Sequence, residues 1–393
     1  MEKTWRWFGK KDKITLAMLR QIGVQGIVTA LHDVPNGEVW TLEAIEDLKA
    51  YIESFGLRWS VVESLPVCEP VKYAGAERDR LVENYKVSLA NLGKAGIRTV
   101  CYNFMPVIDW IRTDLQHPWA DGTSSLYFDR IRFAYFDLKI LEREGAEADY
   151  SPEELCKVIE LDRVITEAEK AELVDTIIVK TQGFVNGNIK EGDLNPVAIF
   201  KRLLTLYRGT DRDTLRANLR YFLTAIMPVC DRYGIDMCIH PDDPPFQVLG
   251  LPRIVTDEAD IAWILNAVDN PHNGLTFCAG SLSAGVQNDT RRLAREFARR
   301  THFVHLRSTD ALPGGNFIES SHFEGRGHLI DLIRIFEREN PSLPMRVDHG
   351  RMMLGDDTRG YNAGYSFHGR MLALAQVEGM MAVVDDEIKN SKQ

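Results

Sequence analysis

The stretch 236-DMCIHPDDPP-245 begins as a short apolar run and ends in a rigid polar corner. The run Asp236–His240 is typical of a strand that is buried on both faces. Two acids and three prolines follow the histidine, which is unusual in a purely structural segment. Taken alone, His240 is more often a hydrogen-bonded structural residue than a ligand, and Asp242 and Asp243 are suited to capping the following turn. A function for this corner therefore depends on which other strand ends face it.

Seven further runs of this kind lie along the chain. Their apolar, β-branched and aromatic composition predicts parallel strands at Thr4–Phe8, Gly26–His32, Arg58–Ser64, Arg98–Phe104, Leu275–Gly280, His302–Ser308 and Met345–Gly350. Helical periodicity separates most of them, at Thr41–Gly56, Asp79–Gly96, Glu258–Asp269, Asn288–Arg299 and His328–Asn340. Strands that alternate with helices in this way predict an α/β fold, a (β/α)₈ TIM barrel. A doubly wound open sheet is the competitor, but no GxGxxG or GxxxxGKS motif follows the early strands to favour it.

The chain between the fourth and fifth predicted strands is much longer than an ordinary barrel loop. Residues 111–230 are expected to form a mainly helical insertion within a single barrel domain that covers residues 1–393. Charged amphipathic patterns at Ser151–Arg163 and Asp213–Cys230 favour helices there. Asp175–Lys180 is the one stretch of the insertion whose composition also suits a strand.

Composition limits the classes of partner. The chain has a net charge of -10, which makes it a poor candidate for binding nucleic acid or an anionic membrane through bulk charge. A small anionic substrate needs only a local basic site. The sequence shows no secretory signal and no apolar run of about 18 residues, and its six cysteines are scattered without a CxxC pair. A cytoplasmic protein with free thiols is expected.

The ends of the predicted strands share a chemistry. In a parallel barrel all carboxyl ends form one rim, where active sites lie. Metal-binding or acid–base residue types close seven of the runs: His32, Glu63, Asn103, His240, Cys278, His305 and Asp348. A lone buried cysteine is more often an apolar filler, so the inference rests on the series. His, Cys, His and Asp close four successive strands, and this set suits a divalent transition metal better than calcium or magnesium.

Polar residues near these strand ends suit a substrate. Arg307 lies two residues past His305 and leaves the strand on the same side, so its guanidinium is a candidate clamp for a carboxylate. Arg346 lies two residues before Asp348 and either orients a ligand or is buried as a charge in the barrel core. His349 is a candidate base.

Loops on the same rim supply further candidates. Tyr365 lies in the loop Gly364–Arg370 after the last strand. His32, Asn103 and Trp110 lie in or beside Gly- and Pro-bearing loops, and sugars often stack on tryptophan and hydrogen-bond to histidine and asparagine. The alternative is a purely structural role, in which Trp110, like Trp40, only packs under its loop.

Long motifs across nearly the whole chain resemble those of the D-mannonate dehydratase family. They are ALHDVPNGEVW (30–40), VVES (61–64), TVCYNFMPVIDWIRTDL (99–115), CIHPDDPP (238–245), GLPRIV (250–255), FCAGS (277–281), VHLRS (304–308), MRVDHG (345–350) and NAGYSFHGR (362–370). The likeness is weakest across residues 117–230. After His322 the family usually carries Gly-Asp-Val-Asp, whereas this chain reads FEGRGHLID (323–331), a difference that bears on loop geometry.

The resemblance implies a metal-dependent lyase that converts D-mannonate to 2-keto-3-deoxy-D-gluconate in hexuronate (glucuronate) catabolism. It implies Mn²⁺ or Fe²⁺ as cofactor, with the family's ligands falling on His240, Cys278, His305 and Asp348. The family's catalytic His and Tyr fall on His349 and Tyr365, and which is base and which is acid stays open. The resemblance also favours a homodimer or higher homo-oligomer.

Three other functions compete at this stage. A metal-dependent sugar isomerase or epimerase begins with the same proton abstraction and differs in losing no water. A catalytically inactive barrel that binds sugar acids is disfavoured by the complete set of ligand and acid–base residues. A zinc hydrolase fits the candidate carboxylate clamp less well.

Overall fold

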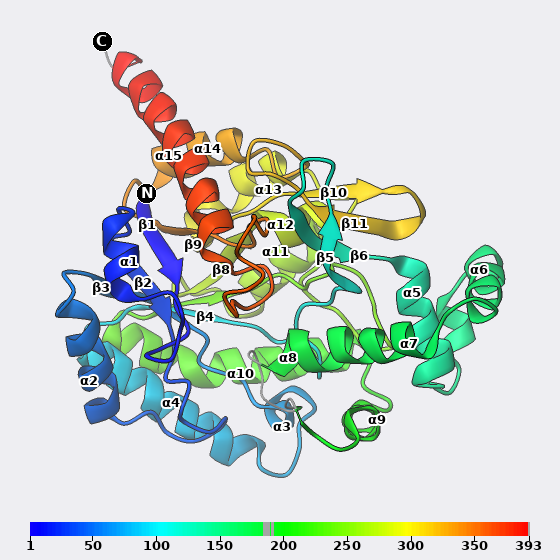
Figure 1. The fold of residues 1–393 in the computed structure, drawn as a ribbon. Coiled ribbons are helices and arrows are strands. Elements are labelled where there is room, and N and C mark those ends of the chain that lie inside the picture. The colour runs from blue at the N-terminus through cyan, green and yellow to red at the C-terminus, as the bar shows by residue number, and fades with distance from the viewer. Residues whose placement is uncertain (184–188, 190–191, 392–393) are drawn as a thin grey trace.

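Eight parallel strands form a closed barrel in the computed structural model, which describes residues 1–183, 189 and 192–391 (Figure 1). In barrel order the strands are β1 (Glu2–Arg6), β2 (Gly26–Thr29), β3 (Arg58–Glu63), β4 (Thr99–Tyr102), β7 (Asp236–Ile239), β8 (Asn273–Cys278), β9 (Thr301–Leu306) and β12 (Pro344–Val347). Each predicted run supplies one of these strands. The predicted TIM barrel is therefore confirmed, and the open doubly wound sheet is excluded because β1 pairs with β12.

Helices cover the outside of the barrel. They include α1 (Leu16–Gln21), α2 (Leu42–Glu53), α4 (Arg78–Lys94), α10 (Arg212–Tyr233), α11 (Glu258–Ala267), α13 (Thr290–Phe297), α14 (Leu329–Glu339) and α15 (Phe367–Asn390). Helix α2 shows why the sequence folds this way. The Thr41 side chain accepts a hydrogen bond from the Ala44 N–H and caps the helix, and the residues spaced three and four apart that follow are buried: Ile45, Leu48 and Ile52.

Side chains fill the interior of the barrel. Val28, Val61, Cys101, Cys238 and Phe303 come from different strands and form one buried cluster. Alternate residues of the same strands belong to the larger core between barrel and helices. The barrel is therefore a packed core and not a channel, so its chemistry is confined to the rim.

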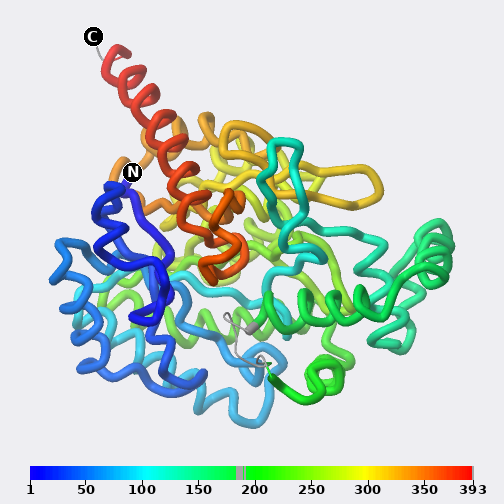
Figure 2. The backbone as a smooth tube through the Cα atoms, in the orientation of Figure 1, coloured from blue at the N-terminus to red at the C-terminus, as the bar shows by residue number. Residues whose placement is uncertain are grey.

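Between β4 and β7 the chain forms a lobe with its own hydrophobic core (Figure 2, green and teal). Its helices include α5 (Arg130–Tyr135), α6 (Pro152–Asp162), α7 (Glu167–Val174), α8 (Thr181–Gly183) and α9 (Pro196–Thr205). Asp175–Lys180 continues α7 as a helical turn, so the strand considered for it is wrong. Residues 184–188 and 190–191 of the predicted insertion lie outside the described residues.

A four-stranded antiparallel sheet, which the sequence did not predict, stands at the carboxyl end of the barrel. Its order is β10 (Thr309–Leu312), β11 (Asn316–Glu319), β6 (Ser124–Phe128) and β5 (Asp114–Pro118). The first two strands follow barrel strand β9, and the other two follow β4. Phe317 and Phe128 are register partners, and their rings stack with centroids 5.1 Å apart. The sheet thus joins two segments that are distant in sequence beside the barrel mouth.

Two shorter helices, α3 (Glu69–Lys72) and α12 (Ala279–Ala284), lie in loops on the same rim. Among the helices of the described residues, none is long and apolar enough to cross a membrane.

Candidate metal centre and active site

Three predicted ligands converge at the rim. The ligand atoms of His240, Cys278 and His305 all lie within 4.8 Å of one another. His240 Nε2 lies 3.2 Å from His305 Nδ1, while His240 Nδ1 lies 2.7 Å from the Pro241 carbonyl oxygen. Since a carbonyl only accepts, Nδ1 carries a hydrogen, and Nε2 is the ring nitrogen that faces the centre.

Asp348 borders this group from the next strand. Its Oδ2 lies 3.8 Å from His305 Nδ1 and 3.9 Å from Cys278 Sγ. Arg346 Nη1 donates to the other oxygen, Oδ1, and Tyr365 O–H lies 3.3 Å from that same oxygen. Arg346 and Tyr365 thus contact one oxygen, and the other faces the His and Cys side chains and lies 3.4 Å from Arg307 Nη1.

The charges of the centre suit a cation. Burial raises the pKa of the Cys278 thiol, but the nearby His240 and His305 rings outweigh burial and hold that pKa well below its usual range. Ser281 O–H also donates to Cys278 Sγ at 3.2 Å. Burial likewise opposes ionisation of Asp348, yet Arg346 holds its pKa well below the usual value. A thiolate, a carboxylate and two imidazoles are a donor set that fits a divalent transition metal.

Arg346 lies beneath the centre, buried in the barrel. Its Nε and Nη2 donate to the Glu63 carboxylate at 3.0 and 2.9 Å, in addition to its bond to Asp348. The sequence left open whether this arginine orients a ligand or is a buried core charge. Arg346 combines both roles: its guanidinium is buried in the barrel, and it binds the carboxylate of Asp348, a predicted ligand, directly.

His349 is fixed on three sides. Its Nδ1 lies 3.2 Å from Glu319 Oε1, its ring packs on Trp110 with centroids 5.1 Å apart, and Tyr365 contacts it edge-on, also at 5.1 Å. The carboxylate only accepts, so Nδ1 carries the hydrogen and Nε2 is left to accept a proton. Trp110 therefore packs against a candidate catalytic ring as well as under its loop.

A buried network of two arginines and two carboxylates supports this side of the site. Arg112 donates to Asp243 at 2.8 Å and to Glu319 at 2.7 Å. Arg307 donates to the same Glu319 at 2.7 Å and to Asp243 at 2.9 Å. Burial raises the pKa of Glu319, but the two guanidinium groups outweigh burial and lower that pKa to about 2. Both acids are therefore ionised, and Arg307 uses most of its donors on protein groups.

The two aspartates of the opening stretch take different positions. Asp242 accepts from the N–H groups of Ile254 and Val255 at 2.8 and 2.7 Å and so caps a turn. Asp243 instead joins the arginine network of the site. Capping, the simpler interpretation of the pair, holds for the first acid and not for the second.

The centre opens into two adjoining cavities. The inner one, of about 60 Å³, is bordered by Asp348, His349, Tyr365, Arg307 and Arg346, among others. The outer one, of about 620 Å³, is bordered by His32 and Trp40. Five residues line both: Arg6, Phe8, Ser64, Asn103 and Asp109.

The predicted substrate-binding residues are distributed between these cavities. Asn103 lies at the boundary, where its Nδ2 donates to Asp109 Oδ2 at 2.6 Å. His32 lines the outer cavity only, and burial, together with the charge of Arg6, lowers its pKa to about 4. His32 is therefore neutral at pH 7, and it is not among the residues that border the inner cavity.

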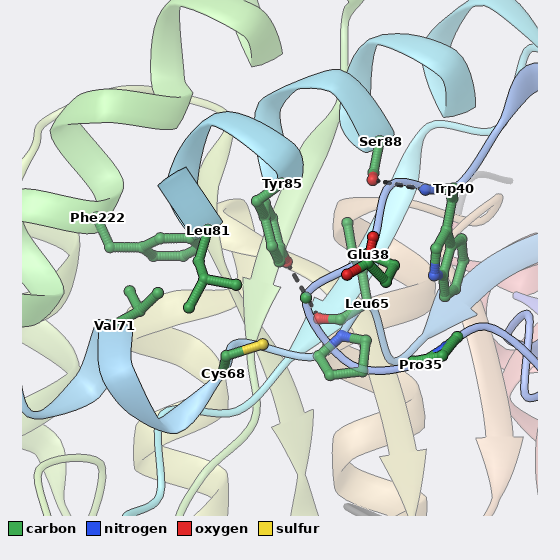
Figure 3. Close-up of a pocket in the computed structure, with 12 residues that line it drawn as sticks. Pro35, Glu38, Trp40, Leu65, Cys68, Val71, Leu81, Tyr85, Ser88 and Phe222 are labelled. Carbon is green, nitrogen blue, oxygen red and sulfur yellow. Dashed lines mark hydrogen bonds between the residues drawn. The ribbon is translucent and has the colours of Figure 1, made fainter. Parts of the chain in front are cut away.

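A separate hollow lies beneath the loop that carries Pro35 and Glu38 (Figure 3). The Trp40 N–H donates to Ser88 Oγ at 3.0 Å, and Tyr85 O–H donates to the Leu65 carbonyl at 3.2 Å. The hollow measures about 10 Å³, which is at the lower limit for a single water molecule. It is therefore a packing defect beside the outer cavity and not a second ligand site.

The structure brings in residues that sequence reasoning did not assign to the site. Glu63 was recognised only as a strand end, and Asp243 only as a turn cap. Arg112 and Glu319 carried no signal, because they come from the unpredicted sheet region and are 207 residues apart. Arg6 closes β1, but the predicted run Thr4–Phe8 extends two residues further, so its end did not point to Arg6.

Fold and site together define a class of protein: a TIM-barrel enzyme whose rim carries a His–Cys–His group able to hold a metal ion beside a candidate base. A family model of D-mannonate dehydratase (UxuA) matches residues 1–391. The chain belongs to the D-mannonate dehydratase family, and its activity is therefore that of a hydro-lyase.

Individual relatives agree with this assignment. A mannonate dehydratase from Marinomonas sp. (strain MWYL1) is 44% identical over 390 residues, covering 97% of this chain and 98% of that protein. One from Chromohalobacter salexigens is 42% identical over 393 residues, covering 98% and 99%. The crystal structure of mannonate dehydratase from Streptococcus suis serotype 2 has a TM-score of 0.78 at 34% identity, covering 99% of this chain and 96% of that one.

Proposed function

We propose that the protein removes water from D-mannonate to give 2-keto-3-deoxy-D-gluconate, as a step in hexuronate catabolism. The proposed cofactor is Mn²⁺ or Fe²⁺, held by His240, Cys278, His305 and Asp348. The observation that carries the proposal is the convergence of these side chains beside His349 in a member of this family. When bound there, a divalent ion supplies Lewis-acid stabilisation of the negative charge that develops on the substrate when the C2–H bond breaks.

His349 is the proposed base. Glu319 accepts the Nδ1 hydrogen and so fixes the tautomer, and Nε2 is available to take the C2 proton. The packing of Trp110 and Tyr365 against the ring restricts its rotation. The base is therefore oriented before substrate arrives, which removes an entropic cost from the reaction.

Tyr365 is the proposed acid. Burial raises the pKa of its hydroxyl, so the group keeps its proton at neutral pH and has one to deliver. The C2–H and C3–O bonds break and a C2=C3 bond forms. The C2 proton goes to His349, the hydroxyl leaves as water with the proton of Tyr365, and the enol product ketonises.

The test is to remove metal with a chelator, restore Mn²⁺ or Fe²⁺, supply D-mannonate and assay the 2-keto-3-deoxy acid. Product that depends on added metal is the expected result. Exchange of the C2 proton with solvent in the absence of product would contradict the proposal and indicate an epimerase or isomerase. Neither product nor exchange, with metal verified as bound, would leave only binding or another substrate.

A further inference from the structure

Three arginines border the inner cavity: Arg6, Arg307 and Arg346. Two of them are largely occupied by the protein itself. Arg307 donates to Glu319 and Asp243, and Arg346 donates to Glu63 and Asp348. A substrate carboxylate placed at either would share its guanidinium with two ionised protein carboxylates, and repulsion from them would weaken the contact.

Arg6 differs from both because, among the described residues, no carboxylate accepts a hydrogen bond from it; an unpartnered nitrogen alone does not set it apart, since Arg307 Nη2 is also buried without a hydrogen-bond partner. Arg6 is the last residue of β1, it is 9% exposed, and its Nη1 is buried without a hydrogen-bond partner among the described residues. The nearest acid is Glu63, whose Oε2 lies 3.6 Å from this Nη1, beyond hydrogen-bond distance. Arg346 already holds both oxygens of that carboxylate. A buried guanidinium with an unused donor is costly unless a ligand satisfies it.

The position of Arg6 suits a ligand that reaches the centre. It lines the inner and the outer cavity, so it lies on the boundary between them. Its guanidinium carbon lies 5.3 Å from the centroid of the Phe8 ring, and that ring contacts Tyr365 edge-on at 5.1 Å. Its backbone carbonyl accepts a hydrogen bond from Arg370, which anchors the end of the strand. The side chain is thus presented from rigid backbone next to the proposed acid.

We propose that Arg6 binds the carboxylate of the sugar acid and is the residue that selects an acid over the corresponding neutral sugar derivative. The inference rests on the proposed function and assigns its carboxylate contact to Arg6, in place of Arg307. A guanidinium pairs with a carboxylate through two parallel hydrogen bonds, and the low dielectric of a buried site strengthens them. In a chain with a net charge of -10, this local cation also offsets the repulsion of an anionic substrate.

The test compares Arg6→Gln, Arg6→Lys and wild type, all loaded with Mn²⁺ and checked for metal content. KM is measured for D-mannonate, and the inhibition constant is measured for D-mannonamide, its neutral amide. Arg6→Gln is expected to raise KM by about 10- to 100-fold, because a charge-assisted contact is lost, while inhibition by the amide changes less than twofold. Arg6→Lys keeps the positive charge but cannot form the two parallel hydrogen bonds of a guanidinium, so an intermediate KM is expected.

Arg98→Gln is the matched control, because Arg98 is exposed at the opposite end of the barrel, where its Nη1 donates to the Tyr233 carbonyl. Its KM should equal that of wild type. A KM within twofold of wild type for both Arg6 variants, or equal weakening of mannonate and amide, would overturn the inference. Inactive wild-type enzyme with metal bound would instead refute the proposed function, so the two failures are distinguishable.

Discussion

At the scale of single residues, His349 is the side chain on which the proposed reaction most depends. Its ring is held by Glu319, Trp110 and Tyr365 and does not itself belong to the His–Cys–His group. The groups that position His349 are therefore distinct from the proposed metal ligands. A substitution of His349 tests its role in the chemistry without removing a ligand.

We expect His349→Asn to lower kcat by about 10²- to 10⁴-fold, because asparagine keeps a hydrogen-bonding amide near Glu319 but cannot accept the C2 proton. Metal content should stay at the wild-type level, since this substitution removes none of the proposed ligands. Turnover of D-mannonate and metal analysis on the same sample check this. His302→Asn, at the opposite end of the barrel, is the control, and near-normal turnover in His349→Asn would remove His349 from the role of base.

Residues at the ends of parallel strands could be placed together from sequence, because all strands of such a barrel point the same way. His240, Cys278, His305 and Asp348 are examples. The groups that orient His349 could not be placed so, because the pairing of Arg112 with Glu319 depends on contacts across 207 residues of chain. No local periodicity encodes such a contact.

At the scale of elements, the antiparallel sheet β10–β11–β6–β5 is what delivers Glu319 to the site. Its strands have four or five residues each and lie in loops, so their alternating pattern is too short to distinguish from irregular chain. The barrel strands, four to six residues long, could be predicted because they are near-continuous apolar runs that recur eight times between helices. The sheet that the sequence did not predict is thus the element that carries Glu319, whose carboxylate orients His349.

Phe317, two residues before Glu319, stacks on Phe128 of the same sheet, and both rings belong to the hydrophobic core of the lobe. We expect Phe317→Ala to lower the free energy of unfolding by about 3 to 5 kcal/mol, since it leaves a cavity in a closely packed core. It should also reduce kcat by roughly tenfold or more, because small displacements of an orienting group are expensive. Urea unfolding and turnover measure the two effects.

Leu312 provides a control on the same hairpin, because it is 37% exposed at the end of β10. Leu312→Ala should change stability by no more than about 0.5 kcal/mol and leave kcat unaltered. If Phe317→Ala loses stability yet keeps full turnover, the sheet would support the fold without positioning Glu319.

At the scale of the whole molecule, buried neutral histidine makes stability depend on pH. His322 Nε2 donates to the Leu306 carbonyl at 2.9 Å, and burial lowers the pKa of the ring to about 4. Unfolded histidine has a pKa near 6.5, so between these values the unfolded chain binds a proton that the folded protein does not. Stability from this group is complete above pH 6.5 and falls as the pH drops toward 4.

We therefore expect acidification from pH 7 to pH 5 to cost the wild type about 2 kcal/mol more than it costs His322→Gln. Glutamine can still donate to the Leu306 carbonyl but has no proton to gain. Urea unfolding of both proteins at the two pH values gives the difference directly, and His32 contributes equally to each. Parallel losses in the two proteins would show that His322 is not kept neutral by the fold.

The pairing of β1 with β12 has a consequence for synthesis. Thr4 pairs with Arg346, so one edge of β1 stays unpaired until the last barrel strand, β12, has been synthesised. A ribosome that adds about 5 to 20 residues per second needs roughly 20 to 70 seconds to span that interval. The proposed ligand Asp348 emerges only then. A nascent chain therefore lacks the full set of proposed ligands until the barrel can close. Until then, the unpaired edge of β1 can pair with strands of other chains and promote aggregation.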